Sequence, residues 1–157
     1  MIVRTATRAD ADAMSAILVE IFKEWGSDRR SDPAFVAEYY IEHPDNVRCS
    51  VISDAEGNVF GFQALKMATE GNMFDLPVGW GIIGTYVSPS SGRKGAGSAL
   101  FAASLEAARQ AGLQNIDATI GKANTIGQAY YEAMGFRTYR ELPTAVGKSF
   151  KVLASVE

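Results

Sequence analysis

The sequence predicts an α/β domain built on a mixed β-sheet with helices on its faces. A strand ending at Val87, a helix ending at Gly112 and a strand with Ile116, Ala118 and Ile120 in alternation follow one another as a βαβ unit, which requires parallel strands. Two strand-like runs, Arg48–Ser53 and Val59–Met67, flank a turn-forming segment and predict an antiparallel hairpin. The composition, 47% apolar and 21% charged, is typical of a globular protein.

Length and charge limit the classes of protein. With 157 residues, the chain is expected to form a single domain over residues 1–157. A net charge of −3 argues against nucleic acid or an anionic membrane as the main partner. The single Cys49 excludes an internal disulfide, and one cysteine with one histidine, His43 in a polar turn, argues against a zinc site. Charged residues interrupt the N-terminus at once, so we expect no targeting segment and a cytoplasmic protein.

The N-terminal part predicts one strand and two helices before the hairpin. Ile2–Thr5 has strand character, and Thr7 or Asp10 can cap a helix whose apolar residues recur at helical spacing until Gly26 ends the pattern. A polar connector then leads to a short helix over residues 35–41.

Glycines mark the central strand. Gly79, Gly81 and Gly84 are unusual inside a strand, and they indicate either a bulge or a ligand that lies against the backbone. We favour the ligand. Pro89 then ends the strand because proline cannot donate to a ladder.

The turn after this strand has the chemistry of an anion site. Two glycines that flank an alanine allow close approach of the backbone, and the helix that starts near Ser98 presents unpaired N–H groups and a positive dipole end. Two cationic side chains precede them, which favours a phosphate or pyrophosphate. The residues expected at this site are Arg93, Lys94, Gly95, Ala96, Gly97 and Ser98.

Other glycine-rich loops fit less well. The Lys and Ser/Thr of a Walker-type phosphate loop are missing after Gly97, and the third glycine of a dinucleotide fingerprint is Leu100. Asp117 lies about twenty residues further on, where a ribose-binding acid would stand. A tight turn that only packs a helix on a strand is the remaining alternative.

The C-terminal part repeats the same stop signal. Asn124 can cap a helix over Thr125–Met134 that ends at Gly135, as the preceding helix ends at Gly112. Two closing strands are predicted over Phe136–Glu141 and Ser149–Ala154.

These motifs resemble the GNAT superfamily of acyl-CoA-dependent N-acyltransferases. The coenzyme motif of that superfamily, a strand ending in Val and then [Q/R]-x-x-G-x-[G/A], matches Val87, Gly95 and Gly97. Its second motif matches Asn124, Tyr131, Glu132, Gly135 and Phe136. Gly92 stands where the loop usually opens with Gln or Arg, and Arg93 follows one residue later, so the departure concerns the side-chain contact and not the backbone cradle. Short matches such as Tyr86–Pro89 resemble the phosphinothricin acetyltransferase-like branch.

The resemblance implies a GNAT fold with about seven strands and four helices, in which antiparallel N-terminal strands precede a splayed parallel pair. It implies acetyl-CoA as cofactor, with the pantetheine arm in the splayed gap and contacts from Tyr86, Val87 and Asn124 as well as the anion loop. The Val87 N–H would polarise the thioester carbonyl.

Tyr131 is our candidate for the residue that stabilises the departing thiolate. Proton transfer from a phenol with a pKa near 10 to a thiolate whose thiol has a pKa near 8.5 costs about 2 kcal/mol. We therefore expect Tyr131 to donate a hydrogen bond first and to protonate the sulfur only as the product leaves. Small Gly127 would leave space beside the phenol. The general base stays unassigned because Val78–Val87 contains no carboxylate or histidine, and Asp75 and Glu70 are the nearest acids.

The acceptor pocket is expected between the Phe22–Arg30 region and the Thr69–Pro77 loop, with Trp25, Arg29, Arg30 and Asp75 as candidate contacts. The leading hypothesis is an N-acetyltransferase for a small primary amine, amino-acid-like in character. One alternative is a non-catalytic acyl-CoA-binding domain of the same fold. Another is a nucleotide-dependent oxidoreductase, which the missing third glycine of the dinucleotide fingerprint disfavours. A homodimer is compatible with each.

Overall fold

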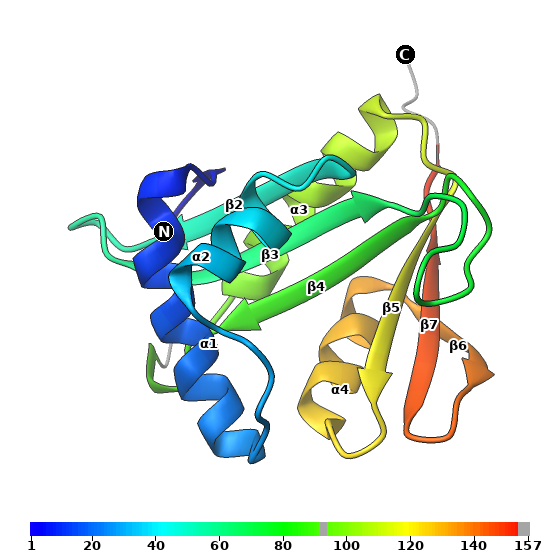
Figure 1. Ribbon diagram of the computed structural model, residues 1–157. Coiled ribbons are helices and arrows are strands. Elements are labelled where there is room, and N and C mark those ends of the chain that lie inside the picture. The colour runs from blue at the N-terminus through cyan, green and yellow to red at the C-terminus, as the bar shows by residue number, and fades with distance from the viewer. Residues whose placement is uncertain (92–93, 154–157) are drawn as a thin grey trace.

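A computed structural model describes residues 1–91 and 94–153 (Figure 1). One mixed seven-stranded sheet has the order β1-β2-β3-β4-β5-β7-β6, and four α-helices accompany it, as expected. The strands are β1 (Ile2–Thr5), β2 (Asn46–Ser53), β3 (Val59–Met67), β4 (Gly81–Val87), β5 (Asn115–Gly121), β6 (Arg137–Glu141) and β7 (Ala145–Lys151), and the helices are α1 (Ala11–Trp25), α2 (Pro33–Val36), α3 (Ala96–Gln110) and α4 (Thr125–Met134).

The first four strands form an antiparallel meander. The predicted hairpin pairs β2 with β3, and β4 returns alongside β3 with Gly84 opposite Ala64. The turn between β2 and β3 is closed by the Asp54 side chain, which accepts from the N–H groups of Glu56 and Asn58.

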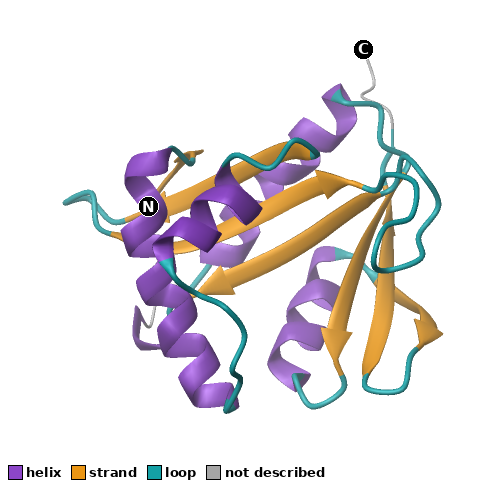
Figure 2. Ribbon diagram, viewed as in Figure 1, coloured by secondary structure: helices purple, strands orange, loops and turns teal. Residues whose placement is uncertain are grey.

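The helices cover both faces of this sheet (Figure 2). On one face, α1 and α2 bury Met14, Leu18 and Val36 against the side chains of Phe62 and Ala64. On the other face, α3 and α4 share a second core, in which Phe101 and Tyr131 pack with Leu65, Ile83 and Ile120. Even-numbered residues of β3 and β4 therefore face α1 and α2, and odd-numbered residues face α3 and α4.

The parallel pair separates soon after it begins. Within the described residues, β4 and β5 pair at Gly81–Ile116 and Ile82–Asp117 alone, and Figure 1 shows the two strands diverging from that end. β5 is held on its other edge by β7 over its whole length. The splay that the resemblance implied is thus present.

Several predicted boundaries need correction. β4 begins at Gly81, because Gly79 has φ +91° and lies in a turn that Trp80 closes with Pro77. β7 begins at Ala145 and not at Ser149, since a short turn after β6 lets the chain return at once. α3 begins two residues before Ser98.

The segment after α2 also differs from a regular helix. Ala37–Ile41 forms a π-helical turn, a geometry that is frequent at functional sites. Among the described residues, no helix combines the length and apolar character needed to cross a bilayer.

Candidate active site

The open edge of β4 offers main-chain groups to the gap. The Ser88 N–H donates to the Phe60 carbonyl on β3, and the antiparallel register alternates from there. The N–H groups of Thr85 and Val87 therefore point away from β3 and toward β5. Because β5 has already diverged at this level, they have no ladder partner within the described residues. Such groups can pair with an extended ligand.

The start of α3 lies at the end of β4 and is an open helix N-terminus. Gly95 has φ +84° at the N-cap and supplies no side-chain cap, and the first helical bond runs from Ala99 N–H to the Gly95 carbonyl. The N–H groups of residues 96–98 are therefore available to an anion. Lys94 is exposed beside them, whereas Arg93 and Gly92 lie outside the described residues.

The glycines have packing roles that the sequence did not reveal. A Cβ at Gly97 would lie 2.4 Å from the Tyr130 ring, so this glycine makes room for a tyrosine rather than directly for a ligand. Gly81 likewise accommodates Leu65, at 2.9 Å from a Cβ. Gly84 differs, because a Cβ there meets nothing closer than 3.3 Å, and the residue borders a cleft.

Tyr131 is buried, yet its side chain borders the same cleft. Its hydroxyl lies 2.7 Å from Thr85 Oγ1 on β4. Burial raises the pKa of this phenol well above its ordinary value, so Tyr131 stays protonated near neutral pH. The structure therefore places a neutral hydrogen-bond donor at the gap.

A buried glutamine orders the hydroxyls around Tyr131. Gln63 Nε2 donates to Thr85 Oγ1 at 2.8 Å and to the Tyr130 hydroxyl at 3.0 Å, and Tyr130 in turn donates to the Gly97 carbonyl at 2.7 Å. Since the carbonyl can only accept, the direction of each bond on the Tyr130 side is fixed. Thr85 can then donate its own proton to Tyr131, which leaves the Tyr131 proton free to face the cleft.

Asn124 caps α4, as predicted, and also borders the cleft. Its Oδ1 accepts from the Gly127 N–H at 2.9 Å. A Cβ at Gly127 would lie 2.5 Å from the Asn124 amide, so this glycine accommodates the cap. The expectation that Gly127 also makes space for the Tyr131 phenol stays a prediction.

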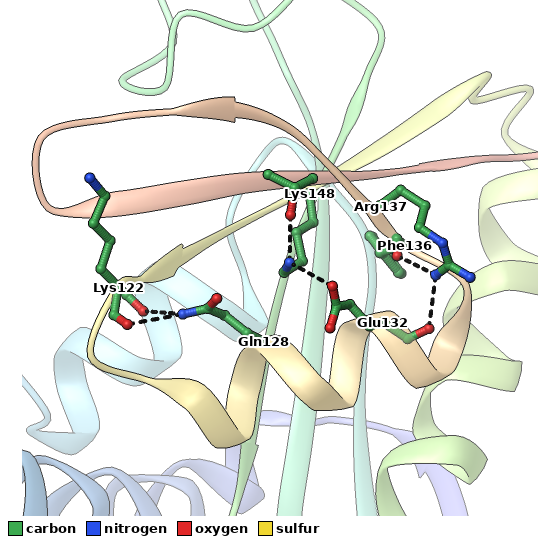
Figure 3. A network of polar contacts seen from close by, with 8 residues as sticks. Lys122, Gln128, Glu132, Phe136, Arg137 and Lys148 are labelled. Carbon is green, nitrogen blue, oxygen red and sulfur yellow. Dashed lines mark hydrogen bonds and ion pairs between the residues drawn. The ribbon is translucent and has the colours of Figure 1, made fainter.

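A polar network fastens α4, which carries Tyr131, to the last two strands (Figure 3). Lys148 of β7 is buried, and its ammonium donates to Thr138 at 2.6 Å and to Glu132 of α4 at 3.3 Å. At the other end of the helix, Gln128 donates to the Lys122 carbonyl. These bonds limit the movement of α4 relative to β5 and β7.

The cleft has a volume of about 1060 Å³ and passes from the gap to the face covered by α1 and α2. The N-terminal end of α4, Thr119 of β5 and Gly84 of β4 border it on one side. Trp25, Tyr39 and Lys66 border it on the other. Cleft residues thus come from helices and strands that lie far apart in the sequence.

Two of the four predicted acceptor contacts lie in this cleft. Trp25 packs 5.8 Å from the Phe22 ring, and the Arg29 guanidinium lies over the same ring at 4.7 Å. Arg29 also donates to the Tyr86 hydroxyl at 3.4 Å. The Tyr86 side chain is therefore on the acceptor side of the sheet, among the rings of Phe22, Tyr40 and Phe62.

The other two predicted contacts, Arg30 and Asp75, do not border the cleft. Both nitrogens of the Arg30 fork bind the Asp32 carboxylate, at 3.0 and 3.1 Å, because Asp32 follows it by two residues. Asp75 is exposed in a turn with φ +52°. The preceding residues of that loop, Asn72–Phe74, border the cleft instead.

Sequence reasoning missed Lys66. Lys66 is half-buried in the cleft with its ammonium 3.2 Å from the centre of the Tyr39 ring, and burial lowers its pKa to about 8. Alternation along β3 could have found it, since Lys66 shares a face with Phe62 and Ala64. His43 lies in a turn, as its sequence indicated, and it also borders the cleft.

The splayed parallel pair, the open helix N-terminus and a protonated tyrosine at the gap define an acyltransferase site of the kind that takes an extended pantetheine thioester. The model of the Acetyltransferase (GNAT) family matches residues 12–136. The chain therefore belongs to the GNAT family, whose acetyltransferases use acetyl-CoA. The comparison with curated proteins gave no match.

Solved structures of acetyltransferases share the fold. The structure of YncA from Salmonella typhimurium, with its cofactor acetyl-CoA, matches with a TM-score of 0.79 at 19% identity. The match covers 99% of this chain and 96% of the YncA chain. Ribosomal-protein-alanine N-acetyltransferase from Brucella melitensis has a TM-score of 0.76 at 20% identity, covering 96% and 99%. A structure described as a phosphinothricin N-acetyltransferase has a TM-score of 0.74 at 19% identity, covering 94% of each chain. The named acceptors differ, so fold similarity leaves the acceptor open.

Proposed function

We propose that the protein transfers the acetyl group of acetyl-CoA to the primary amine of a small, amino-acid-like molecule by direct attack in a ternary complex. The observation that carries this proposal is the placement of Tyr131 at the splayed gap, beside unpaired N–H groups of β4 and in a cleft open to the opposite face of the sheet.

The residues present fit acetyl-CoA, which when bound supplies the acetyl group as a reactive thioester. The N–H groups at the start of α3 and the exposed Lys94 suit its pyrophosphate. Along β4, the open N–H group of Thr85 suits an amide oxygen of a pantetheine arm. The Val87 N–H is our candidate to polarise the thioester carbonyl as negative charge develops on its oxygen.

Tyr131 is assigned to the departing sulfur. Because its pKa is raised by burial, it acts as a hydrogen-bond donor to the thiolate and gives up its proton only as the product leaves. The Gln63 and Thr85 side chains hold its hydroxyl in position, and with Thr85 as the donor to Tyr131 the Tyr131 proton is available to the sulfur.

The acceptor enters from the α1 and α2 face. Arg29 lies at the rim, and neither it nor Lys66 forms an ion pair with a carboxylate within residues 1–91 and 94–153. Two unpaired cations beside an aromatic wall suit an amine that also bears a carboxylate. We therefore retain Trp25 and Arg29 as acceptor contacts and add Lys66.

A screen of primary amines tests this function. The purified protein is incubated with acetyl-CoA and amines with or without a carboxylate, and release of free thiol is followed. We expect turnover with at least one carboxylated amine and a raised KM for it in Arg29→Ala, with Arg30→Ala as the matched control. Binding of acetyl-CoA without acetylation of any amine would instead support the non-catalytic alternative.

A further inference from the structure

A buried acidic side chain stands next to the gap without a role in the scheme above. Asp117 is fully buried on β5. Its neighbours Ile116 and Ala118 belong to the core under α3 and α4, so the Asp117 carboxylate faces the other side of the sheet, the side from which the acceptor enters. β4 itself contains no acid or histidine.

Two hydroxyl groups donate to this carboxylate. Thr119 Oγ1 donates to Asp117 Oδ2 at 2.7 Å, and the Tyr139 hydroxyl donates to Oδ1 at 2.6 Å. Thr119 also borders the cleft, whereas Tyr139 and Asp117 do not. Since the Thr119 proton is directed at Asp117, the lone pairs of Thr119 Oγ1 are left for a donor in the cleft.

A β-bulge in β6 makes the contact between Tyr139 and Asp117 possible. Tyr139 is the extra residue at a bulge between β6 and β7, where Thr138 pairs with Lys148 and Arg140 already pairs with Gly147. Tyr139 must reach across β7 to meet β5. Gly147 leaves that path open, because a Cβ there would lie 3.2 Å from the Tyr139 ring and 2.7 Å from Arg140.

Thr119 stands at the point where the strands separate. The last pair of the parallel ladder is Ile82–Asp117, so the same offset puts Gly84 and Thr119 at the same level and on the same face, on opposite sides of the opening gap. Both border the cleft. An amine that attacks a thioester lying along Gly84–Val87 from the acceptor side therefore passes next to Thr119.

Two other titratable groups of the cleft, Lys66 and His43, are less well placed. Lys66 belongs to β3, where it lies opposite Ile82 of β4 in the sheet register. β4 therefore lies between Lys66 and the gap, which opens on the other edge of β4. His43 Nδ1 accepts from the Asp45 N–H at 3.1 Å, which puts the proton of the neutral ring on Nε2 and leaves no accepting nitrogen for an amine.

We propose that Thr119 and Asp117 form the proton-accepting pair of the reaction, with Thr119 as the residue that touches the acceptor nitrogen. As the nitrogen lone pair forms the C–N bond, its proton passes to Thr119 Oγ1 while the Thr119 proton passes to Asp117 Oδ2. The C–S bond breaks with its electron pair on sulfur, and Tyr131 donates to that thiolate. Asp117 then loses its proton to solvent through Thr119, and Tyr131, which protonates the thiolate as the product leaves, regains a proton from solvent, so the protons balance. This inference rests on the proposed function.

The surroundings suit a base. Burial raises the pKa of Asp117 above the ordinary value of a carboxyl, while the hydrogen bonds from Tyr139 and Thr119 and the charge of Arg140 act in the opposite direction. Tyr139 and Arg140 of β6 are the titratable or charged side chains facing it from the neighbouring strands, and Tyr131 of α4 interacts with it electrostatically.

Substitutions at Thr119 test the pair without removing the buried carboxylate. Thr119→Val keeps the shape and removes the hydroxyl, and we expect kcat to fall about 100-fold, within the range for loss of general-base catalysis. Thr119→Ser should recover kcat to within about threefold. Acetyl-CoA affinity by calorimetry should change little in both. The Tm should fall in Thr119→Val, where the buried Asp117 carboxylate loses one of its two hydrogen bonds, and should change little in Thr119→Ser. Asp117→Asn should lower kcat similarly and abolish the acid limb of the pH profile.

Tyr139→Phe tests whether Asp117 takes part in catalysis, because a purely structural Asp117 would leave the pH profile of kcat/KM unchanged. Removing this hydrogen bond raises the pKa of Asp117 further, so the acid limb of kcat/KM should shift to higher pH while the plateau is kept. Carbon-13 NMR titration of the Asp117 carboxyl without acetyl-CoA should show the same shift. A wild-type protein that acetylates no amine would defeat the proposed function itself. An active wild type with full kcat in Thr119→Val, a Thr119→Ser variant as slow as Thr119→Val, or an acid limb unmoved in Tyr139→Phe would overturn the pair alone.

Discussion

The substitution Tyr131→Phe isolates one hydrogen bond at the leaving group. The variant keeps the ring in the core and removes the hydroxyl that lies 2.7 Å from Thr85. A hydrogen bond to a charged group contributes roughly 1.5–3 kcal/mol, and each 1.36 kcal/mol is tenfold in rate, so kcat should fall about 10- to 150-fold. Thr85 still accepts from Gln63 at 2.8 Å, so the free energy of unfolding should change by about 1 kcal/mol or less.

The assay is thiol release under saturating acetyl-CoA and acceptor, with a burst experiment to show that chemistry is rate-limiting. Acetyl-CoA affinity should stay within about twofold, because the phenol acts on charge that develops during transfer. Tyr130→Phe is the matched control, since its hydroxyl binds Gly97 and Gln63 and not the gap. An unchanged kcat in Tyr131→Phe, or an equal fall in Tyr130→Phe, would refute the assignment.

Three further predictions concern stability. Gly97→Ala places a Cβ 2.4 Å from the Tyr130 ring and should lower the free energy of unfolding by about 1–3 kcal/mol. Calorimetry should show a lower Tm, which Tyr130→Leu partly restores. An unchanged Tm would contradict the packing role. Burial lowers the pKa of Lys66 from 10.5 to about 8, so the unfolded chain binds the proton more tightly and wild-type stability rises between these pH values. Lys66→Met should therefore raise the free energy of unfolding most below pH 8, in urea titrations, with the gain fading near pH 10.5. Asn124→Ala removes the cap on Gly127 and should cost about 1 kcal/mol in the same titrations, and no loss would contradict the capping role.

Local signals accounted for most of the fold. The glycine after α1 at Gly26 and the one after α4 at Gly135 both adopt φ above +60°, and Asn124 caps as its type predicts. These features depend on residues within one turn of each other. The βαβ unit and the hairpin followed from periodicity and turn chemistry in the same way.

The site was less predictable because its contacts depend on register and on competing partners. Arg30 was expected to bind an acceptor, but Asp32 two residues away binds it. Asp117 was noted only for its distance from the glycine loop, whereas its partner Tyr139 reaches it across a strand at a bulge. A bulge and a cross-strand neighbour are set by the register of the whole sheet, which spacing along the chain does not fix.

Calorimetric titration with acetyl-CoA tests the central claim most directly, that the open β4 edge and the start of α3 hold this coenzyme. We expect saturable binding of one acetyl-CoA per chain and a Tm that rises with its concentration, with neither effect for NAD. Absence of binding heat together with an unchanged Tm at millimolar acetyl-CoA would contradict the account.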